Sequence, residues 1–222
     1  MEPDALGVGP ARRPGRRAAD ALPAPDEREI LRQGMEAFAE LGYDRASARE
    51  LAKRLGVSHN FINDRYGSKA NFWRAVVDAL LEQNLRERRH VVEAHVDDAD
   101  LVRALITHFY LAAAETPLLG RLLADEFSRE SERADYLYEH YVSPTLEPVV
   151  LAVERLVAAG RMPSAPLDIL FFTVIGPVAG LVQLPLARRL GRADPVTEES
   201  QARTARQLAD LIADGLLGRQ PH

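Results

Sequence analysis

Apolar residues recur at helical spacing from residue 26 almost to the end of the chain, and this periodicity constrains the fold more than any other feature. The first segment carries its stripe at Ile30, Gly34, Ala37, Phe38 and Leu41. Nowhere in the sequence do apolar and polar residues alternate for long enough to predict a strand. Further helices are predicted over residues 99–115, 117–130, 131–158, 166–189 and 197–217. We therefore predict an all-α protein.

The first two helices carry start and stop signals. Asp26 is a candidate N-cap of the first helix, and Gly42 follows its last apolar residue. Ser47 and Glu50 have the S-x-x-E spacing of a capping box, in which each side chain accepts a hydrogen bond from an amide that the helix leaves free. Gly56 ends the second helix. The chain therefore begins its helical region with two short, separately capped helices.

Two more helices follow the glycine-containing turn. Ser58 is a candidate N-cap of a third helix that reaches Tyr66, and Ser68 is a candidate N-cap of a fourth helix that starts at Lys69. The fourth helix is long, with apolar positions at Phe72, Trp73, Val76, Val77, Leu80, Leu81 and Leu85. A short helix, a glycine-containing turn and a second short helix are the geometry of a helix-turn-helix.

The third helix is predicted to show polar side chains on its exposed face. With Ile62 and Tyr66 turned inward, the residues on the opposite face are Asn60, Asn63 and Asp64. Short side chains that both donate and accept hydrogen bonds reach base edges in the major groove, where the second helix of a helix-turn-helix lies. We therefore predict that this helix reads DNA. The alternative is an internal helical hairpin with no nucleic-acid partner.

Residues beside the third helix extend the predicted surface. His59 and Phe61 flank its outward face, and an apolar side chain such as Phe61 can meet the methyl group of thymine. Arg45 and Arg49, near the start of the second helix, are candidate phosphate contacts. The alternative for both arginines is a solvated charge, which is the commoner role of an exposed arginine.

This region resembles the TetR family of one-component transcriptional regulators over residues 26–80. The resemblance is carried by FAELGYDRAS at 38–47, LAKRLGVS at 51–58 and YGSK at 66–69. It implies that Lys69, at the start of the fourth helix, contacts a backbone phosphate, which agrees with the affinity of helix N-termini for phosphate. The predicted DNA-binding residues are Arg49, Ser58, His59, Asn60, Phe61, Asn63, Arg65, Tyr66 and Lys69.

Five positions depart from the pattern that the resemblance implies. Asn63 stands where the family usually has a phosphate-contacting tyrosine, Asp64 where a second aromatic is common, and Arg65 where histidine is frequent. Phe61 replaces a small hydroxyl residue, and Asn60 replaces a frequent glycine. The operator sequence therefore cannot be inferred from better-matching relatives. A carboxylate is repelled by phosphates unless it accepts a hydrogen bond from a cytosine amine or pairs with a cation such as Arg65. We therefore expect Asp64 to be structural and not base-reading.

Residues 86–222 resemble the family's ligand-binding and dimerisation region in helical layout. The resemblance implies a homodimer in which a small molecule bound among these helices moves the fourth helix and changes the spacing of the two reading helices. This requires that the ligand bind the two states with different affinities. Aromatic side chains line most ligand pockets, although each one is more often part of the core. The candidate ligand contacts are Trp73, His108, Phe109, Tyr110, Tyr138, Tyr141 and Phe172.

Residues 169–187 form a run of 19 residues without a charged side chain, which just reaches the length of a membrane span. Pro177, Gln183 and Pro185 argue against insertion into a membrane. A helix that is apolar on all sides is also expected where it packs on its own chain and on a second copy. We therefore favour a dimer interface, to which the final helix contributes a matching stripe at Ala205, Leu208, Ile212 and Leu216.

Residues 1–25 are rich in Gly, Pro, Ala and Arg and lack apolar periodicity, so we predict a disordered arm. The arm either lies along DNA or enters a minor groove, or it is a solvated tail. Its ARRPGRR segment carries Arg12, Arg13, Arg16 and Arg17. Residues 1–70 hold 12 Lys/Arg and 11 Asp/Glu, whereas residues 71–222 hold 16 and 22. This asymmetry agrees with a local anion-binding patch near the N-terminus.

No motif predicts catalysis, a metal site or a cofactor. The sequence has no cysteine, no H-E-x-x-H pair, no Walker loop and no G-x-S-x-G. The lack of cysteine and of a secretory signal predicts a cytoplasmic protein.

We predict three parts: a basic arm (1–25), a helix-turn-helix domain (26–85) and a ligand-binding and dimerisation domain (86–222). The predicted function is a dimeric, ligand-responsive repressor of a near-palindromic DNA operator, and not an enzyme. One alternative is an all-α ligand-binding or enzymatic protein whose helix-turn-helix is vestigial. Another is a membrane-associated regulator anchored by residues 169–187.

Overall fold

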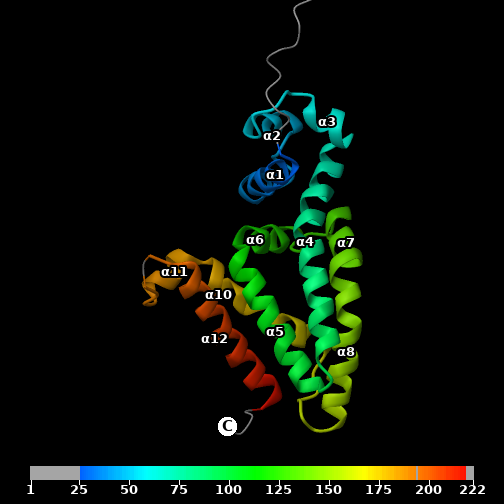
Figure 1. Ribbon diagram of the computed structural model, residues 1–222, viewed down its shortest axis with the longest axis vertical. Helices are drawn as coiled ribbons and strands as arrows, with labels where there is room; N and C mark the ends of the chain where they lie inside the picture. The colour runs from blue at the N-terminus through cyan, green and yellow to red at the C-terminus, as the bar shows by residue number, and fades with distance from the viewer. Residues whose placement is uncertain (1–25, 194, 219–222) are drawn as a thin grey trace, which may run out of the picture.

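The computed structural model describes residues 26–193 and 195–218, and within them the chain forms helices and no strand (Figure 1). The prediction of an all-α fold is confirmed. The N-terminal helices are α1 (Glu27–Leu41), α2 (Ala48–Arg54), α3 (Phe61–Tyr66) and α4 (Lys69–Ala94). The predicted arm, with Arg12, Arg13, Arg16 and Arg17, lies outside the described residues.

The C-terminal helices follow the predicted segments, with breaks inside two of them. They are α5 (Asp98–Glu115), α6 (Pro117–Glu126), α7 (Glu132–Leu137), η1 (Tyr138–Val142), α8 (Ser143–Ala158), α9 (Leu167–Ile175), η2 (Gly176–Val178), α10 (Ala179–Val182), α11 (Leu184–Arg189) and α12 (Glu198–Leu217). The η1 segment is a π-helical turn that joins α7 to α8, and η2 is a 3₁₀ turn.

Helices α1 to α3 and the start of α4 share one hydrophobic core, to which α6 and α7 add Leu122 and Leu137. Its most buried members include Ile30, Phe38, Leu51, Ile62, Phe72 and Trp73. Gly34 of α1 faces α4, where a Cβ atom would lie 2.6 Å from Cζ of Phe72. The predicted stripe of α1 is thus buried, with Leu41 half-buried at its end. The close crossing of α1 and α4 depends on the absence of a side chain at Gly34.

Three of the four predicted N-caps are confirmed. A side-chain oxygen accepts a hydrogen bond from an amide of the first turn at Asp26, Ser47 and Ser68. The prediction that the third helix starts directly after Ser58 is wrong. The Ser58 carbonyl accepts a hydrogen bond from the amide of Phe61 and so closes a separate turn. Helix α3 therefore begins only at Phe61.

The predicted capping box at the start of α2 is one-sided. Ser47 accepts a hydrogen bond from the amide of Glu50 at 3.1 Å, as expected. The amide of Ser47 donates to the carbonyl of Arg45, and the Glu50 carboxylate pairs with Arg54 at 3.5 Å. The Glu50 carboxylate therefore forms an ion pair on the helix surface instead of the capping-box bond to the Ser47 amide.

Helix α4 joins the two halves of the molecule (Figure 1). It has 26 residues and is therefore about 39 Å long at 1.5 Å per residue. Its first turns insert Phe72 and Trp73 into the N-terminal core, and it also packs against α5. The predicted domain border at residue 85 lies inside this helix. A displacement of α4 would therefore be felt in both halves.

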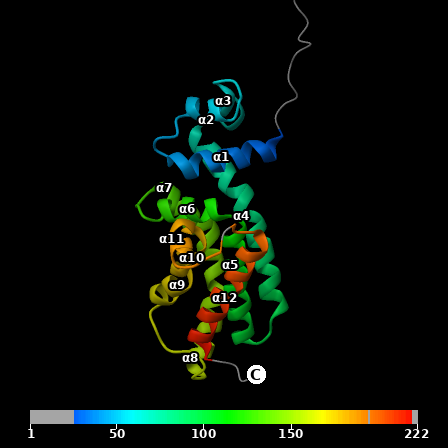
Figure 2. The same ribbon diagram turned by 90° about the vertical axis from the view of Figure 1, so that its left-hand side faces the viewer.

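The C-terminal core centres on α5 and α12, which lie along each other (Figure 2). The buried face of α12 consists of Gln201 and three small residues, namely Ala205, Ala209 and Ala213. Tyr110 of α5 is fully buried, and its hydroxyl donates to the carbonyl of Val174 in α9 at 2.6 Å. The stripe predicted for the final helix, which includes Ala205, therefore packs to a large extent on α5 of the same chain.

The apolar run 169–187 is not one helix. It breaks at Gly176 and Pro177, which form η2, and again at Gln183 before Pro185. Proline lacks an amide hydrogen and clashes with the carbonyl four residues earlier, so a straight helix cannot continue. None of the helices in the described residues is long and apolar enough to cross a membrane.

Candidate DNA-binding surface

Two side chains fix the orientation of α3. Ile62 has no exposed surface, and the ring of Tyr66 lies 4.8 Å from that of Phe72 between centroids. The ring of Phe61 meets the edge of Tyr66 at 6.4 Å. Burial raises the pKa of Tyr66 above its ordinary value, so its hydroxyl stays protonated. One face of this six-residue helix is therefore anchored in the core, as its sequence predicted.

The opposite face of α3 is open to solvent. Asn60, Asn63 and Asp64 are all exposed, and none of them is covered by the later helices. Figure 1 shows α3 at the far end of the molecule from α8 and the end of α12. Amide groups at these positions are free to meet the edges of base pairs. The display of polar groups that the spacing predicted is thus present in the fold.

Ion pairs constrain some of the basic residues around α3. Arg65 donates to Glu27 of α1 at 2.7 Å, and Arg54 donates to Glu40. Arg49 and Lys53 are exposed, and neither forms an ion pair within the described part of the chain. These two cations are the ones most available to an approaching phosphate.

Lys69 does not stand free in solvent. It is the first residue of α4, and the Ser68 hydroxyl caps this helix by accepting a hydrogen bond from the amide of Asn71. The Lys69 ammonium donates to the carbonyl of Tyr43 at 3.0 Å and lies over the Tyr43 ring, 4.0 Å from the centroid. The predicted phosphate-contacting group is therefore half-buried on the α1–α2 connection.

The fold gathers the predicted DNA-binding residues around α3. The exposed ones are Arg49, Ser58, His59, Asn60, Asn63 and Arg65, and the half-buried ones are Phe61, Tyr66 and Lys69. Sequence reasoning did not find Tyr43, which holds Lys69, or Glu27, which holds Arg65. Tyr43 and Lys69 are 26 positions apart, so no local spacing could have linked them.

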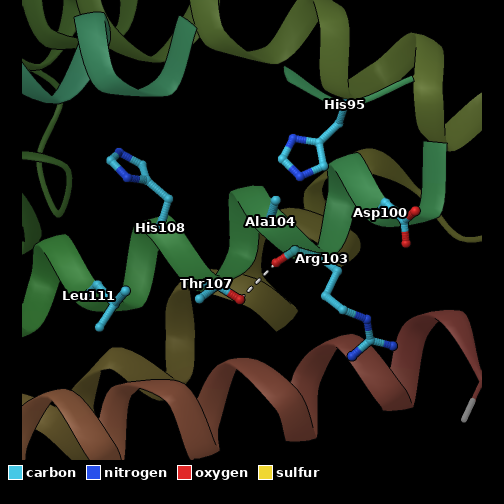
Figure 3. A pocket seen from close by; sticks show the side chains of 7 residues that line it. All are labelled: His95, Asp100, Arg103, Ala104, Thr107, His108 and Leu111. Carbon is cyan, nitrogen blue, oxygen red and sulfur yellow. Dashed lines mark hydrogen bonds between the residues drawn. The ribbon is translucent and has the colours of Figure 1, made fainter. Parts of the chain in front are cut away.

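A second candidate site is an open pocket of about 520 Å³ along α5 (Figure 3). It is lined by His95, Asp100, Arg103, Ala104, Thr107, His108 and Leu111. Figure 3 shows His95 and His108 on one side of α5 and Arg103 turned toward the other. Arg103 is held there by Asp214 of α12 at 2.8 Å. Burial lowers the pKa of His108, and the charge of Arg88 acts in the same direction.

Of the predicted ligand contacts, only His108 lines this pocket. Trp73 and Tyr110 are core residues, and Phe109 is half-buried beside Tyr110. Tyr141 bonds to Asp78 of α4. Tyr138 and Phe172 are exposed. The fold therefore disperses the aromatic residues that the sequence grouped, because they come from helices that face different sides of the domain.

The N-terminal helices match a known protein family. Residues 30–76 match the family model described as "Bacterial regulatory proteins, tetR family". No curated protein sequence matches the chain.

Solved structures resemble the whole fold at low sequence identity. A putative fatty acid metabolism regulator of Clostridium perfringens has a TM-score of 0.66 at 14% identity, with 86% of this chain and 100% of that chain covered. The TetR family regulator PfmR of Thermus thermophilus has a TM-score of 0.58 at 18% identity, covering 90% and 100%. FadR of Bacillus subtilis, solved with stearoyl-CoA, has a TM-score of 0.61 at 12% identity, covering 86% and 100%.

These similarities agree on one architecture, a helix-turn-helix unit followed by a helical domain. Regulators of the matched family bind DNA and are not enzymes. The exposed face of α3 is the surface that such a function requires. Residues 30–76 therefore carry the DNA-binding domain of the tetR family of bacterial regulatory proteins, and the whole chain has the fold of solved TetR family regulators.

Proposed function

We propose that the protein is a homodimeric repressor that binds a near-palindromic operator and leaves it when a small molecule binds the C-terminal domain. The observation that carries the proposal is the outward display of Asn60 and Asn63 on a helix anchored by Ile62 and Tyr66. Two copies related by a two-fold axis present two such helices, which favours an operator with two related half-sites.

The residues of the surface have different proposed roles. Asn60 and Asn63 contact base edges, because a side-chain amide both donates and accepts hydrogen bonds. Phosphate contacts are assigned to Arg49 and Lys69, and Arg65 joins them once it leaves Glu27. The remaining predicted contacts lie at the rim, namely Ser58, His59, Phe61 and Tyr66.

An exposed apolar surface supports the homodimer. Phe172 of α9 is 63% exposed, Leu190 after α11 is 80% exposed and Leu211 of α12 is 71% exposed. Ile169 and Leu186 add to the exposed apolar side chains of the same segments. We assign these side chains to one patch, because a large exposed apolar patch marks an interaction site. The assignment agrees with the interface predicted for residues 169–187.

The effector is proposed to be a small molecule that binds the C-terminal domain, with the α5 pocket as its first candidate site. The pocket lies where α5 runs beside the end of α4, so occupancy could bias the position of α4. Release follows if the effector binds the DNA-free arrangement more tightly than the DNA-bound one. Because FadR was solved with stearoyl-CoA, long-chain acyl-CoAs are the first compounds to test.

The test is selection of bound sequences from a random DNA pool with the purified protein. Repeated enrichment of a site with two inverted half-sites is expected. Addition of an acyl-CoA series then shows which compounds release the enriched duplex. Recovery of no preferred sequence would favour a ligand-binding protein with a vestigial helix-turn-helix. Activation of a promoter that carries the site would contradict the repressor assignment.

A further inference from the structure

Tyr43 connects the predicted phosphate contact Lys69 with the C-terminal domain. The Lys69 ammonium lies 4.0 Å from the centroid of the Tyr43 ring. The guanidinium carbon of Arg133, from α7, lies 3.8 Å from the same centroid. The two charges are therefore within about 8 Å of each other, which is less than a Debye length in dilute salt. One ring is shared by a cation from each domain.

The Tyr43 ring itself is fixed by the N-terminal core. It stacks on Phe38 with centroids 6.0 Å apart and meets the edge of Trp73 at 6.4 Å. The preceding Gly42 has φ +72°, a conformation that glycine adopts without strain. Removal of Arg133 would leave these contacts in place. The ring would therefore stay beside Lys69, with one cation fewer over it.

Arg133 is held by the C-terminal domain. Its Nε donates to the Glu126 carboxylate at 2.8 Å, and Glu126, at the end of α6, is only 4% exposed. Burial raises the pKa of Glu126, whereas the charge of Arg133 opposes that rise. Since a buried carboxylate is costly without its partner, Arg133 follows Glu126 when α6 and α7 move. The charge over Tyr43 thus depends on the arrangement of the C-terminal domain.

We propose that Arg133 is a positioning residue that weakens the internal hold on Lys69 and so keeps this lysine available to DNA. The inference rests on the phosphate contact assigned to Lys69 under the proposed function. Like charges over one ring repel each other, so Arg133 opposes the attraction between Lys69 and Tyr43. When a change in the C-terminal domain withdraws Arg133, Lys69 binds Tyr43 more tightly and meets phosphate less readily.

The chain offers a direct measurement, because Lys53 and Lys69 are its two lysines. Lys53 is exposed and serves as the internal reference. Brief acetylation of the DNA-free full chain, followed by mass spectrometry, gives the ratio of modification at Lys69 to that at Lys53. The variant Arg133→Gln is expected to lower this ratio by about two- to fivefold, the range of an exposed cation–π contact. Arg133→Lys, which keeps the charge, is expected to restore the ratio.

Two variants separate this effect from damage to the fold. The double variant Glu126→Gln with Arg133→Gln removes both charges and leaves no unpaired buried carboxylate. It is expected to show the same lowered ratio. Arg129→Gln is the matched control, because Arg129 bonds to Asp44 and Asp125 and not to the Tyr43 ring. Its ratio is expected to equal that of the natural chain. An unchanged or raised ratio in the double variant overturns the proposal.

Binding to the selected operator duplex gives the functional half of the test. Arg133→Gln is expected to weaken binding by about two- to fivefold when Lys69 is present and to have no further effect in Lys69→Ala. Equal losses in both backgrounds mean a merely structural role and overturn the proposal. Lys69→Ala itself should lower the slope of log affinity against log salt by about one unit. An unchanged slope with a lowered labelling ratio refutes the phosphate contact but not the coupling.

Discussion

Asn63 lies on the exposed face of α3, with Asn60 preceding it by about one turn. We expect Asn63→Ala to relax the preference at one position of each operator half-site by about 1 to 3 kcal/mol, because a bidentate amide contact to a base is lost. Affinities for the selected site and for single-base variants measure this. Gln83→Ala, on the surface of α4, is the control. A uniform loss over all sequences would make Asn63 a backbone contact.

Gly34 and Gly120 both lie in helices, but replacement by alanine is expected to change the free energy of unfolding in opposite directions. At Gly34 a Cβ atom would lie 2.6 Å from Phe72 and 2.9 Å from Val76, so Gly34→Ala should lower the free energy of unfolding by about 1 to 3 kcal/mol. At Gly120 nothing lies within 4 Å, so Gly120→Ala should raise it by about 0.5 to 1 kcal/mol. Urea denaturation of both variants decides. Equal effects would contradict the close approach of α1 and α4.

The contacts of Asp97 make the free energy of unfolding depend on pH. Its carboxylate bonds to Arg161 and to the amides of Ala99 and Asp100 at the start of α5, and these contacts hold its pKa at about 2. Because this pKa lies below the ordinary 3.8, the stabilisation is present above pH 4 and is lost as the pH falls toward 2. Asp97→Asn should therefore flatten the acid limb of the unfolding free energy against pH. If the natural chain and Asp97→Asn lost stability in parallel at low pH, Asp97 would not be the group responsible.

At the scale of the element, the π-helical turn η1 explains how two tyrosines reach one carboxylate. Tyr136 and Tyr141 both donate to Asp78 of α4, with the Tyr136 bond at 2.8 Å. Residues five apart point about 140° away from each other on a regular α-helix. The wider π turn between them reduces this angle. It also precedes Pro144, which cannot donate a helical hydrogen bond.

This geometry predicts a difference between neighbouring tyrosines. Tyr141→Phe should lower the free energy of unfolding by about 1 kcal/mol, because a hydrogen bond between α4 and η1 is lost. Tyr138→Phe, on the same turn but 52% exposed, should have no effect. Thermal denaturation of the two variants measures this. A loss of the same size in both would mean that the hydroxyl bond to Asp78 does not stabilise the contact.

At the scale of the whole molecule, the proposed dimer places a demand on α9 to α12. Phe172→Glu should yield a monomer in sedimentation experiments, because it puts a charge into the proposed apolar interface. It should also weaken binding to a full operator more than to a single half-site. Leu151→Glu on α8 is the control, since Leu151 is exposed outside these segments. A Phe172→Glu protein that remains dimeric would place the interface elsewhere.

The sequence by itself determined the helices and the display on α3. Apolar spacing and capping residues are local properties, so the all-α fold, the caps at Asp26, Ser47 and Ser68 and the inward direction of Ile62 were predictable. The start of α3 was not, because the turn closed by the Ser58 carbonyl competes with side-chain capping.

Only the tertiary structure decided which distant groups meet. Lys69 lies on Tyr43, and Arg133 reaches the same ring from another domain, although these residues are far apart in sequence. The aromatic residues expected in one pocket were dispersed for the same reason, and only His108 lines the α5 pocket. Periodicity states which face of a helix is buried, but it does not state what that face meets. That depends on how the helices cross, as at Gly34, where the lack of a side chain brings α1 against α4.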